Sequence, residues 1–207
     1  MARVSQEHLD ARRRQIMDGA ALCFARNGFH ATSMQDVLKE VGLSAGAVYR
    51  YFSGKEELIH AIVTEALDDV GAVYEEAARQ VPPALPHELV HRVMREVQGL
   101  RPGLRDEGGR PVFGRLMVQV WTETLRDPAL AVAIQDGFDR ICATWVAIVE
   151  GYQEAGVMPA EADVEAVART MIAAVQGFIA QQTLFRDVPA EALQAGLWGL
   201  MSMREVS

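Results

Sequence analysis

Cysteine is scarce in this sequence, which has only Cys23 and Cys142 among its 207 residues. The two lie far apart and lack the short spacing of a metal site. One pair cannot form the dense disulfide framework of small secreted proteins. We expect both to be small buried hydrophobic side chains in a reducing compartment. A redox-sensing thiol at Cys142 is the alternative, although nothing in the sequence supports the low thiol pKa that it would need.

Long apolar runs are also absent. No run reaches the roughly 18 to 20 residues that span a bilayer, and the polar, charged residues 1–14 do not resemble a secretory signal peptide. The hydrophobic share is nevertheless 50%, far above that of disordered chains. The composition predicts a cytoplasmic protein without a membrane partner, built as one large domain or as a small module joined to a larger one.

The chain has little strand character, because it lacks a sustained alternation of β-branched and polar residues. Ile16, Ala20 and Phe24 instead recur at the four-residue spacing of a helix face. We predict an all-α fold, in which an N-terminal three-helix helix-turn-helix domain precedes a larger C-terminal helical bundle with a dimer interface. The predicted helices run from about 5 to 27, 33 to 42, 44 to 52 and 53 to 82, followed by 86–100, 111–126, 128–155, 163–186 and 189–204.

Capping-box spacing marks several of these helix starts. Thr32 with Gln35 and Ser33 with Asp36 are alternative boxes for the second helix, and Ser53 with Glu56 opens the fourth.

The stretch from Met34 to Phe52 carries the functional signal. It predicts two short helices joined by a turn at Gly42, the pattern of a helix-turn-helix whose second helix enters the major groove of DNA. Ser44-Ala45-Gly46-Ala47 is a run of small side chains that allows close approach of the backbone to DNA. In Tyr49-Arg50-Tyr51 the guanidinium can pair with guanine or phosphate, and the phenols can bond phosphate. Taken alone, Tyr49-Arg50-Tyr51 is more typical of a solvated helix face with two half-buried aromatics than of a DNA contact. The flanking Gly42, Ser44, Gly46 and Lys55 reverse this preference.

This segment resembles the TetR family of bacterial regulators. In that family the third helix reads DNA, and the Tyr and Lys positions hold backbone phosphates. The matching residues are Gly28-Phe29, Thr32-Ser33, Gly42-Leu43-Ser44, Gly46, Val48-Tyr49, Tyr51-Phe52 and Lys55-Glu56-Glu57-Leu58, with Ile16, Ala20 and Phe24 in the first helix. The resemblance implies a DNA-binding site composed of Thr32, Ser33, Ser44, Ala45, Gly46, Tyr49, Arg50, Tyr51 and Lys55.

Two positions depart from the family pattern. Ala45 stands where a basic residue is common, so we expect binding to depend more strongly on Arg50. Leu38 stands where a small residue is common, which alters the packing of the two helices rather than their chemistry.

Charge is unevenly distributed along the chain. The net charge of −8 by itself disfavours binding to DNA. Residues 1–55, however, carry eight Lys and Arg against five Asp and Glu, whereas residues 56–207 carry twelve against twenty-three. We therefore expect the basic end to face double-stranded DNA. We interpret Arg12-Arg13-Arg14 as a solvated helix face, and Arg3 as part of an arm that reaches the minor groove.

One enzymatic motif competes with this interpretation. His87-Glu88-Leu89-Val90-His91 places two histidines on one helix face beside a glutamate that can act as general base, as in zinc proteases. No histidine follows His91 to supply a third ligand, and no β-sheet is predicted beside the motif. A zinc hydrolase is therefore the distant alternative, and we expect no enzyme activity, no metal and no cofactor.

A homodimer follows from the DNA-binding interpretation, because one helix-turn-helix contacts too few base pairs and a palindromic operator needs two. The resemblance implies a four-helix interface from the last two helices of each subunit. This gives a DNA-binding domain over residues 1–54 and a ligand-sensing and dimerisation domain over residues 55–207. The predicted interface residues are Val164, Ala168, Met171, Val175, Ile179, Leu193, Leu197, Trp198 and Met201.

The resemblance also implies that a small molecule binds within the second domain and changes the separation of the two reading helices. We predict a repressor that is released by a small hydrophobic effector. An effector-independent activator or architectural DNA-binding protein is the alternative. The predicted pocket consists of apolar side chains that ordinary core packing would also use, namely Phe113, Met117, Trp121, Phe138, Trp145 and Phe178.

Overall fold

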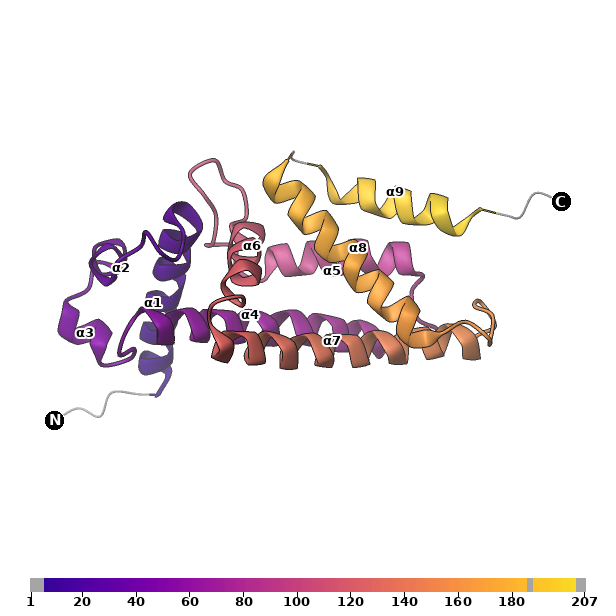
Figure 1. Cartoon of the computed structure of the whole chain (residues 1–207), viewed down its shortest axis with the longest axis horizontal. Helices are drawn as coiled ribbons and strands as arrows, with labels where there is room; N and C mark the ends of the chain where they lie inside the picture. Colours follow the sequence, from indigo (N-terminus) through magenta and orange to yellow (C-terminus); the bar gives the residue numbers. More distant parts are fainter. Residues whose placement is uncertain (1–5, 186–187, 204–207) are drawn as a thin grey trace. The chain divides into compact units, whose positions relative to one another are not determined.

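The structure, a computed structural model, describes residues 6–185 and 188–203, which contain nine α-helices and no β-strand (Figure 1). The predicted all-α fold class is therefore confirmed. Arg3, the predicted minor-groove residue, lies outside the described residues. The helices are α1 (Gln6–Asn27), α2 (Met34–Val41), α3 (Ala45–Tyr49), α4 (Lys55–Ala78), α5 (Pro86–Gly99), α6 (Phe113–Glu123), α7 (Pro128–Glu154), α8 (Val164–Leu184) and α9 (Ala190–Met201).

The chain forms two compact units. Unit 1 consists of Met1–Ala66 and Arg101–Ala133, and unit 2 consists of Leu67–Leu100 and Ile134–Ser207. Unit 1 therefore combines α1, α2 and α3 with α6 and with the first parts of α4 and α7. The predicted division at residue 54 separates DNA binding from ligand sensing and dimerisation, which is a difference in role. The two compact units do not test it, so it stays a prediction.

The core of unit 1 forms where helical spacing predicts it. Ile16, Ala20 and Phe24 of α1 are fully buried, as are Val37 of α2 and Val48 of α3. This burial removes from water one face of each of the three helices, which is the main favourable term in holding them together. The three-helix arrangement of the N-terminal segment is therefore confirmed.

Side-chain caps set the ends of these helices. The Ser33 hydroxyl accepts from the Asp36 amide at 3.3 Å, and the Asp36 carboxylate accepts from the Ser33 amide at 2.8 Å. Of the two boxes predicted for α2, the structure therefore forms Ser33 with Asp36. The chain leaves α2 through Gly42, whose φ of 65° lies in the left-handed region that glycine adopts without strain.

Two predictions for this region are wrong in detail, one about the end of the third helix and one about the capping partner of Ser53. The third helix ends at Tyr49 rather than near Phe52, and the Tyr51 and Phe52 amides both donate to the Val48 carbonyl in the turn that follows. Ser53 is held by Glu57 rather than Glu56, with both its amide and its hydroxyl 2.7 Å from Glu57 Oε2.

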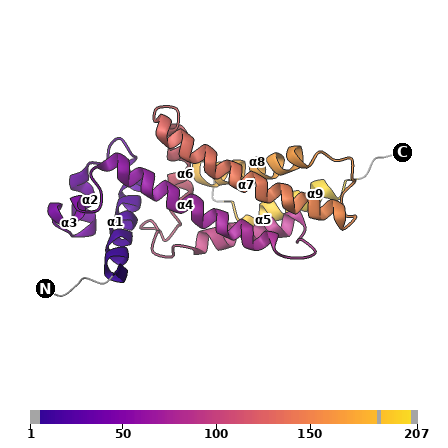
Figure 2. The same ribbon diagram turned by 90° about the horizontal axis from the view of Figure 1, so that it is seen from below.

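Unit 2 has a separate core built from α5, α8, the C-terminal part of α7 and the end of α4 (Figure 2). Trp145 is fully buried in it and packs against Tyr74, with the two ring centroids 5.7 Å apart. Burial raises the pKa of Tyr74 to about 12, so its phenol stays neutral. Within this unit α9 packs on α5. Among the described residues, no helix is long and apolar enough to cross a membrane.

Candidate nucleic-acid interface

The short helix α3 presents one face to solvent and buries the other. Val48 is 0% exposed, whereas Tyr49 is 48% exposed and Ala45, Gly46 and Arg50 are also exposed. The Arg50 guanidinium forms no hydrogen bond or ion pair with any described residue. A buried valine thus anchors a helix whose outer face is small at one end and carries a phenol and an unpaired cation at the other.

Ser44 and Ser33 are exposed and sit at the starts of the two helices of the motif. The Ser44 hydroxyl accepts from the Ala47 amide at 3.4 Å and caps α3. The Ser33 hydroxyl donates to Asp36 at 2.6 Å, and this bond together with the Ser33 amide lowers the pKa of the Asp36 carboxyl. The cap of α2 therefore carries a carboxylate at neutral pH. Both residues are exposed to solvent.

The predicted DNA contact of Thr32 does not fit the structure. Its side chain is buried, with the residue 1% exposed, and its hydroxyl donates to the Gly28 carbonyl at 2.7 Å. It also lies 3.3 Å from the Cys23 carbonyl. Carbonyl groups at a helix end have no partner within the helix, and Thr32 supplies one. Its hydroxyl is therefore a structural cap of α1 and is not available to DNA.

Lys55 begins α4 and lies beside the turn between α1 and α2. Its ammonium donates to the Phe29 carbonyl at 3.0 Å. An ammonium has three donors, so this bond leaves two for another acceptor such as a phosphate. Tyr51, four residues before Lys55, is half-buried. Its ring is therefore less accessible to DNA than that of the exposed Tyr49.

The three consecutive arginines of α1 are engaged within unit 1. Arg13 and Arg14 lie 3.9 and 3.7 Å from the Glu65 carboxylate, and Arg12 donates to Gln15 at 2.8 Å. The Arg13 and Arg14 side chains remain 45% and 71% exposed, and their interpretation as a solvated helix face stays a prediction.

The two histidines of the zinc-protease motif each lie near one glutamate. His91 lies 3.4 Å from Glu191 of α9, and His87 lies 4.0 Å from Glu88. Among the described residues, no group of three His, Cys, Asp or Glu side chains is arranged to hold a metal ion.

The predicted dimer residues fall into two groups. Ala168, Met171 and Val175 belong to the core of unit 2, so their side chains are already covered within the subunit. Trp198 and Met201 of α9 are 60% and 49% exposed. The remaining predicted residues are half-buried: Val164, Ile179, Leu193 and Leu197.

The predicted effector residues are also divided between the two units. Phe113, Met117 and Trp121 lie on α6 in unit 1 and are half-buried. Phe138, Trp145 and Phe178 lie in unit 2, where Trp145 and Phe178 are part of the core and Phe138 packs against it. Because ordinary packing already accounts for these three, the pocket stays a prediction.

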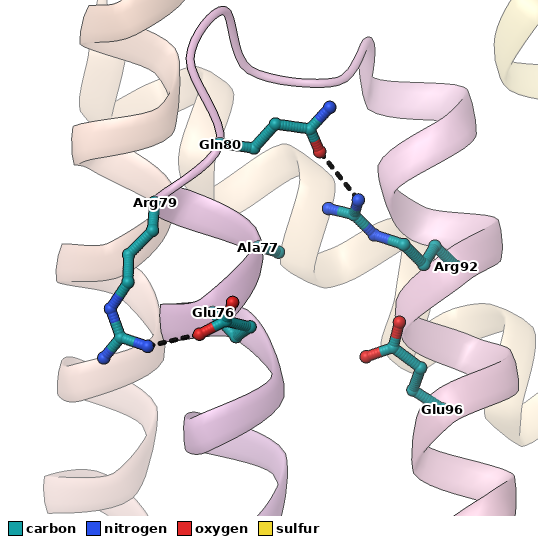
Figure 3. Close-up of a pocket in the computed structure, with 6 residues that line it drawn as sticks. All are labelled: Glu76, Ala77, Arg79, Gln80, Arg92 and Glu96. Carbon is teal, nitrogen blue, oxygen red and sulfur yellow. Dashed lines mark hydrogen bonds and ion pairs between the residues drawn. The ribbon is translucent and has the colours of Figure 1, made fainter.

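Two pockets on unit 2 are lined by other residues. One, of about 230 Å³, lies between the end of α4 and α5, where Arg92 donates to Gln80 at 2.7 Å (Figure 3). Its lining mixes two carboxylates with two guanidinium groups. The other, of about 220 Å³, lies between α4 and α7, where Arg140 pairs with Asp68 at 2.9 Å. None of the predicted effector residues lines either pocket.

The fold and this surface together define a helix-turn-helix DNA-binding protein. Comparison with family models extends this result to most of the chain. Residues 16–62 match the model described as "Bacterial regulatory proteins, tetR family", and residues 95–197 match "BetI-type transcriptional repressor, C-terminal". The chain belongs to the TetR family of transcriptional regulators, which confirms the resemblance found in its N-terminal quarter. Members of this family are regulators rather than enzymes, so the zinc-hydrolase alternative is set aside.

Similar proteins support this assignment. The HTH-type transcriptional regulator YfiR of Bacillus subtilis is 34% identical over 122 residues, which cover 58% of this chain and 56% of that protein. The chain thus matches little more than half the length of this relative. GusR of Salmonella enterica has a structure that superposes with a TM-score of 0.71 at 26% identity, covering 98% of this chain and all of GusR.

A second solved structure shares the fold. A putative transcriptional regulator of Saccharomonospora viridis, solved in complex with choline, superposes with a TM-score of 0.73 at 22% identity. The superposition covers 96% of this chain and 99% of that one.

Proposed function

We propose that this protein is a cytoplasmic repressor that binds a palindromic operator as a homodimer and leaves it when a small hydrophobic effector binds. The observation that carries the DNA-binding part is the outer face of α3. There Arg50 is exposed and unpaired among the described residues, beside small side chains that let the helix approach a base edge.

Selection from random duplex DNA, followed by fluorescence anisotropy, tests this part. We expect an inverted repeat whose half-sites lie about one helical turn apart, because a two-fold dimer presents two α3 helices to one face of the duplex. Enrichment of a single asymmetric site would contradict the dimeric mode, and equal binding to all duplexes would contradict sequence-specific recognition.

Replacing Lys55 by alanine is expected to weaken binding on every sequence tested, because the ammonium holds a backbone phosphate that carries no sequence information. The measurement is a salt series. The slope of log affinity against log salt should become shallower by about one for each Lys55 ammonium removed, which is about two for a dimer. An unchanged slope would mean that Lys55 does not bind a phosphate.

The proposed dimer surface is the outer face of α8 and α9. It combines exposed apolar side chains, including Leu184, Trp198 and Leu200, with small residues such as Ala173 and Gly177. Small residues allow helix backbones to approach closely, and exposed apolar patches of this kind mark interaction sites. We expect the partner to meet this face, rather than the Ala168, Met171 and Val175 side chains that the subunit covers itself.

The variant Gly177→Arg is expected to turn the dimer into a monomer while each subunit stays folded. A Cβ added at Gly177 would meet nothing within 4 Å inside the subunit, so the arginine has room in a monomer and none in a close helix–helix interface. Sedimentation velocity measures the change. Gly71→Arg is the matched control, since a Cβ there also meets nothing within 4 Å. A dimer that tolerates Gly177→Arg as well as Gly71→Arg would contradict the proposed surface.

Effector binding in unit 2 is supported by buried nitrogen atoms that lack partners. Among the described residues, His87 Nδ1 and Arg92 Nη2 are buried side-chain nitrogen atoms without a hydrogen bond, and both belong to unit 2. Buried polar groups are normally paired, so an unpaired group in a native fold calls for a specific reason. The choline complex of the Saccharomonospora viridis protein adds a precedent for a small ligand on this fold.

A thermal-shift screen tests the effector, with choline as a cationic probe beside a panel of small hydrophobic compounds. Any compound that stabilises the protein is then titrated into the protein–operator complex. We expect a hydrophobic compound to raise the melting temperature and to lower operator affinity, because only a ligand with different affinity for the two states shifts their balance. Stabilisation without loss of operator affinity, or no stabilisation by any compound, would favour the effector-independent alternative.

A further inference from the structure

One side chain of α6 is bonded directly to the end of α1. The amide of Gln119 forms two hydrogen bonds with backbone groups there. Its Nε2 donates to the Phe24 carbonyl at 2.9 Å, and its Oε1 accepts from the Phe29 amide at 3.0 Å. The Gln119 side chain therefore joins α6 at two points to Phe24 and Phe29, which precede it in the sequence by 95 and 90 positions.

Of the two backbone groups, the Phe29 amide is the one that needs Gln119, because it lies just beyond the end of α1, whereas the Phe24 carbonyl also accepts from the Gly28 amide at 2.8 Å. The chain turns at Gly28, which has a φ of 88°, and this turn directs the following amide away from the helix. Phe29 is 5% exposed, and its ring packs edge-on against Phe24 with centroids 5.1 Å apart. A buried backbone amide without a partner costs about as much as a missing hydrogen bond, and Gln119 supplies the partner.

The same Phe29 residue holds Lys55. Its amide donates to Gln119, and its carbonyl accepts from the Lys55 ammonium at 3.0 Å. Gln119, Phe29 and Lys55 thus form a continuous chain of hydrogen bonds from α6 to the first residue of α4. The contact of Lys55 with Phe29 fixes one of the three ammonium donors and so limits the directions of the other two.

We propose that Gln119 is a positioning residue for DNA binding: it fixes the Phe29 backbone, whose carbonyl aims the Lys55 ammonium at a phosphate. This inference rests on the phosphate contact proposed for Lys55. Other links within unit 1 do not touch this backbone, for example the ion pair of Arg101 with Asp18 at 3.2 Å and that of His60 with Asp127 at 2.8 Å. Variants at these other links can therefore show whether Gln119 acts on Lys55 specifically or only stabilises the fold of unit 1.

A double-mutant cycle on the selected operator tests the proposal. Operator affinity and its salt slope are measured for wild type, Gln119→Ala, Lys55→Ala and the double variant. Gln119→Ala should lower affinity roughly threefold to tenfold per subunit, the range for one or two hydrogen bonds. It should also make the salt slope shallower, toward that of Lys55→Ala. In the double variant, the alanine at position 119 should have little further effect, because Lys55 is no longer there to be aimed.

Arg101→Ala is the matched control, since it removes a different link between the 101–133 segment and α1. It should leave the salt slope unchanged even if it lowers stability. Chemical denaturation of each free protein identifies losses of affinity that arise from unfolding. If Gln119→Ala is too unstable to assay, Gln119→Leu replaces it in the cycle, because leucine fills similar space and has neither an acceptor for the Phe29 amide nor a donor for the Phe24 carbonyl.

The outcomes separate the two claims. A normal loss of slope for Lys55→Ala together with an unchanged slope for Gln119→Ala, or additive losses in the double variant, would overturn the role of Gln119 alone. An unchanged slope for Lys55→Ala would overturn the phosphate contact, and with it the basis of the proposal.

Discussion

Replacing Arg50 by alanine is expected to lower operator affinity by about 1–3 kcal/mol for each half-site and to relax the base preference at one position of that half-site. The side chain is exposed at the end of α3 and unpaired among the described residues, so its removal breaks no internal bond of the free protein. The expected loss arises from a guanidinium that pairs bidentately with guanine, a geometry that lysine does not reproduce. The absence of a basic residue at Ala45 makes this contact more important.

The measurement compares operator variants rather than one duplex. Each base of a half-site is changed in turn, and affinities of wild type and Arg50→Ala are determined by anisotropy at fixed salt. Arg95→Ala, which removes an exposed arginine from α5, is the matched control and should bind like wild type. If Arg50→Ala weakened binding to every duplex by the same factor, Arg50 would be assigned to a phosphate rather than to a base.

Replacing Phe24 by alanine is expected to lower the free energy of unfolding by about 3–5 kcal/mol, the range for a large buried aromatic ring. Phe24 is 0% exposed, and its ring meets that of Phe29 at the end of α1. The cavity would lie directly beneath the turn that carries Thr32 and the Phe29 backbone. We therefore expect operator binding to fall together with stability, since domains are stable by only about 5–15 kcal/mol.

Urea denaturation followed by circular dichroism measures the loss, and anisotropy at low temperature measures binding. The control is Leu125→Ala in the same unit, where the leucine is 86% exposed and its removal should change stability by less than about 0.5 kcal/mol. A loss for Phe24→Ala as small as that of the control would mean that the ring does not hold α1 to its neighbours.

Local patterns predicted much of the DNA-binding unit. The spacing of Ile16, Ala20 and Phe24 identified the buried face of α1, and all three are fully buried. Ser33 and Asp36 stand at capping-box spacing and form that box. These features depend on residues within about one helical turn of one another, so helix geometry alone relates the sequence to the contact.

Other features were beyond local patterns. The Thr32 hydroxyl faces α1 rather than solvent, because the turn at Gly28 brings the end of α1 back over it. The apolar arc of α8 was predicted as dimer interface, but the side chains of Ala168 and Met171 are covered by the subunit itself. An apolar stripe specifies that a face is removed from water and does not specify which surface covers it.

The sequence by itself determined the helices, the Ser33–Asp36 cap and the small-residue face of α3, and with them the class of protein. Only the tertiary structure placed the 101–133 segment in one compact unit with the DNA-binding helices and brought Gln119 to the end of α1. The physical reason is the range of the interactions. Helix formation and capping are decided within a few residues, whereas a hydrogen bond across 90 positions exists only after the chain has packed.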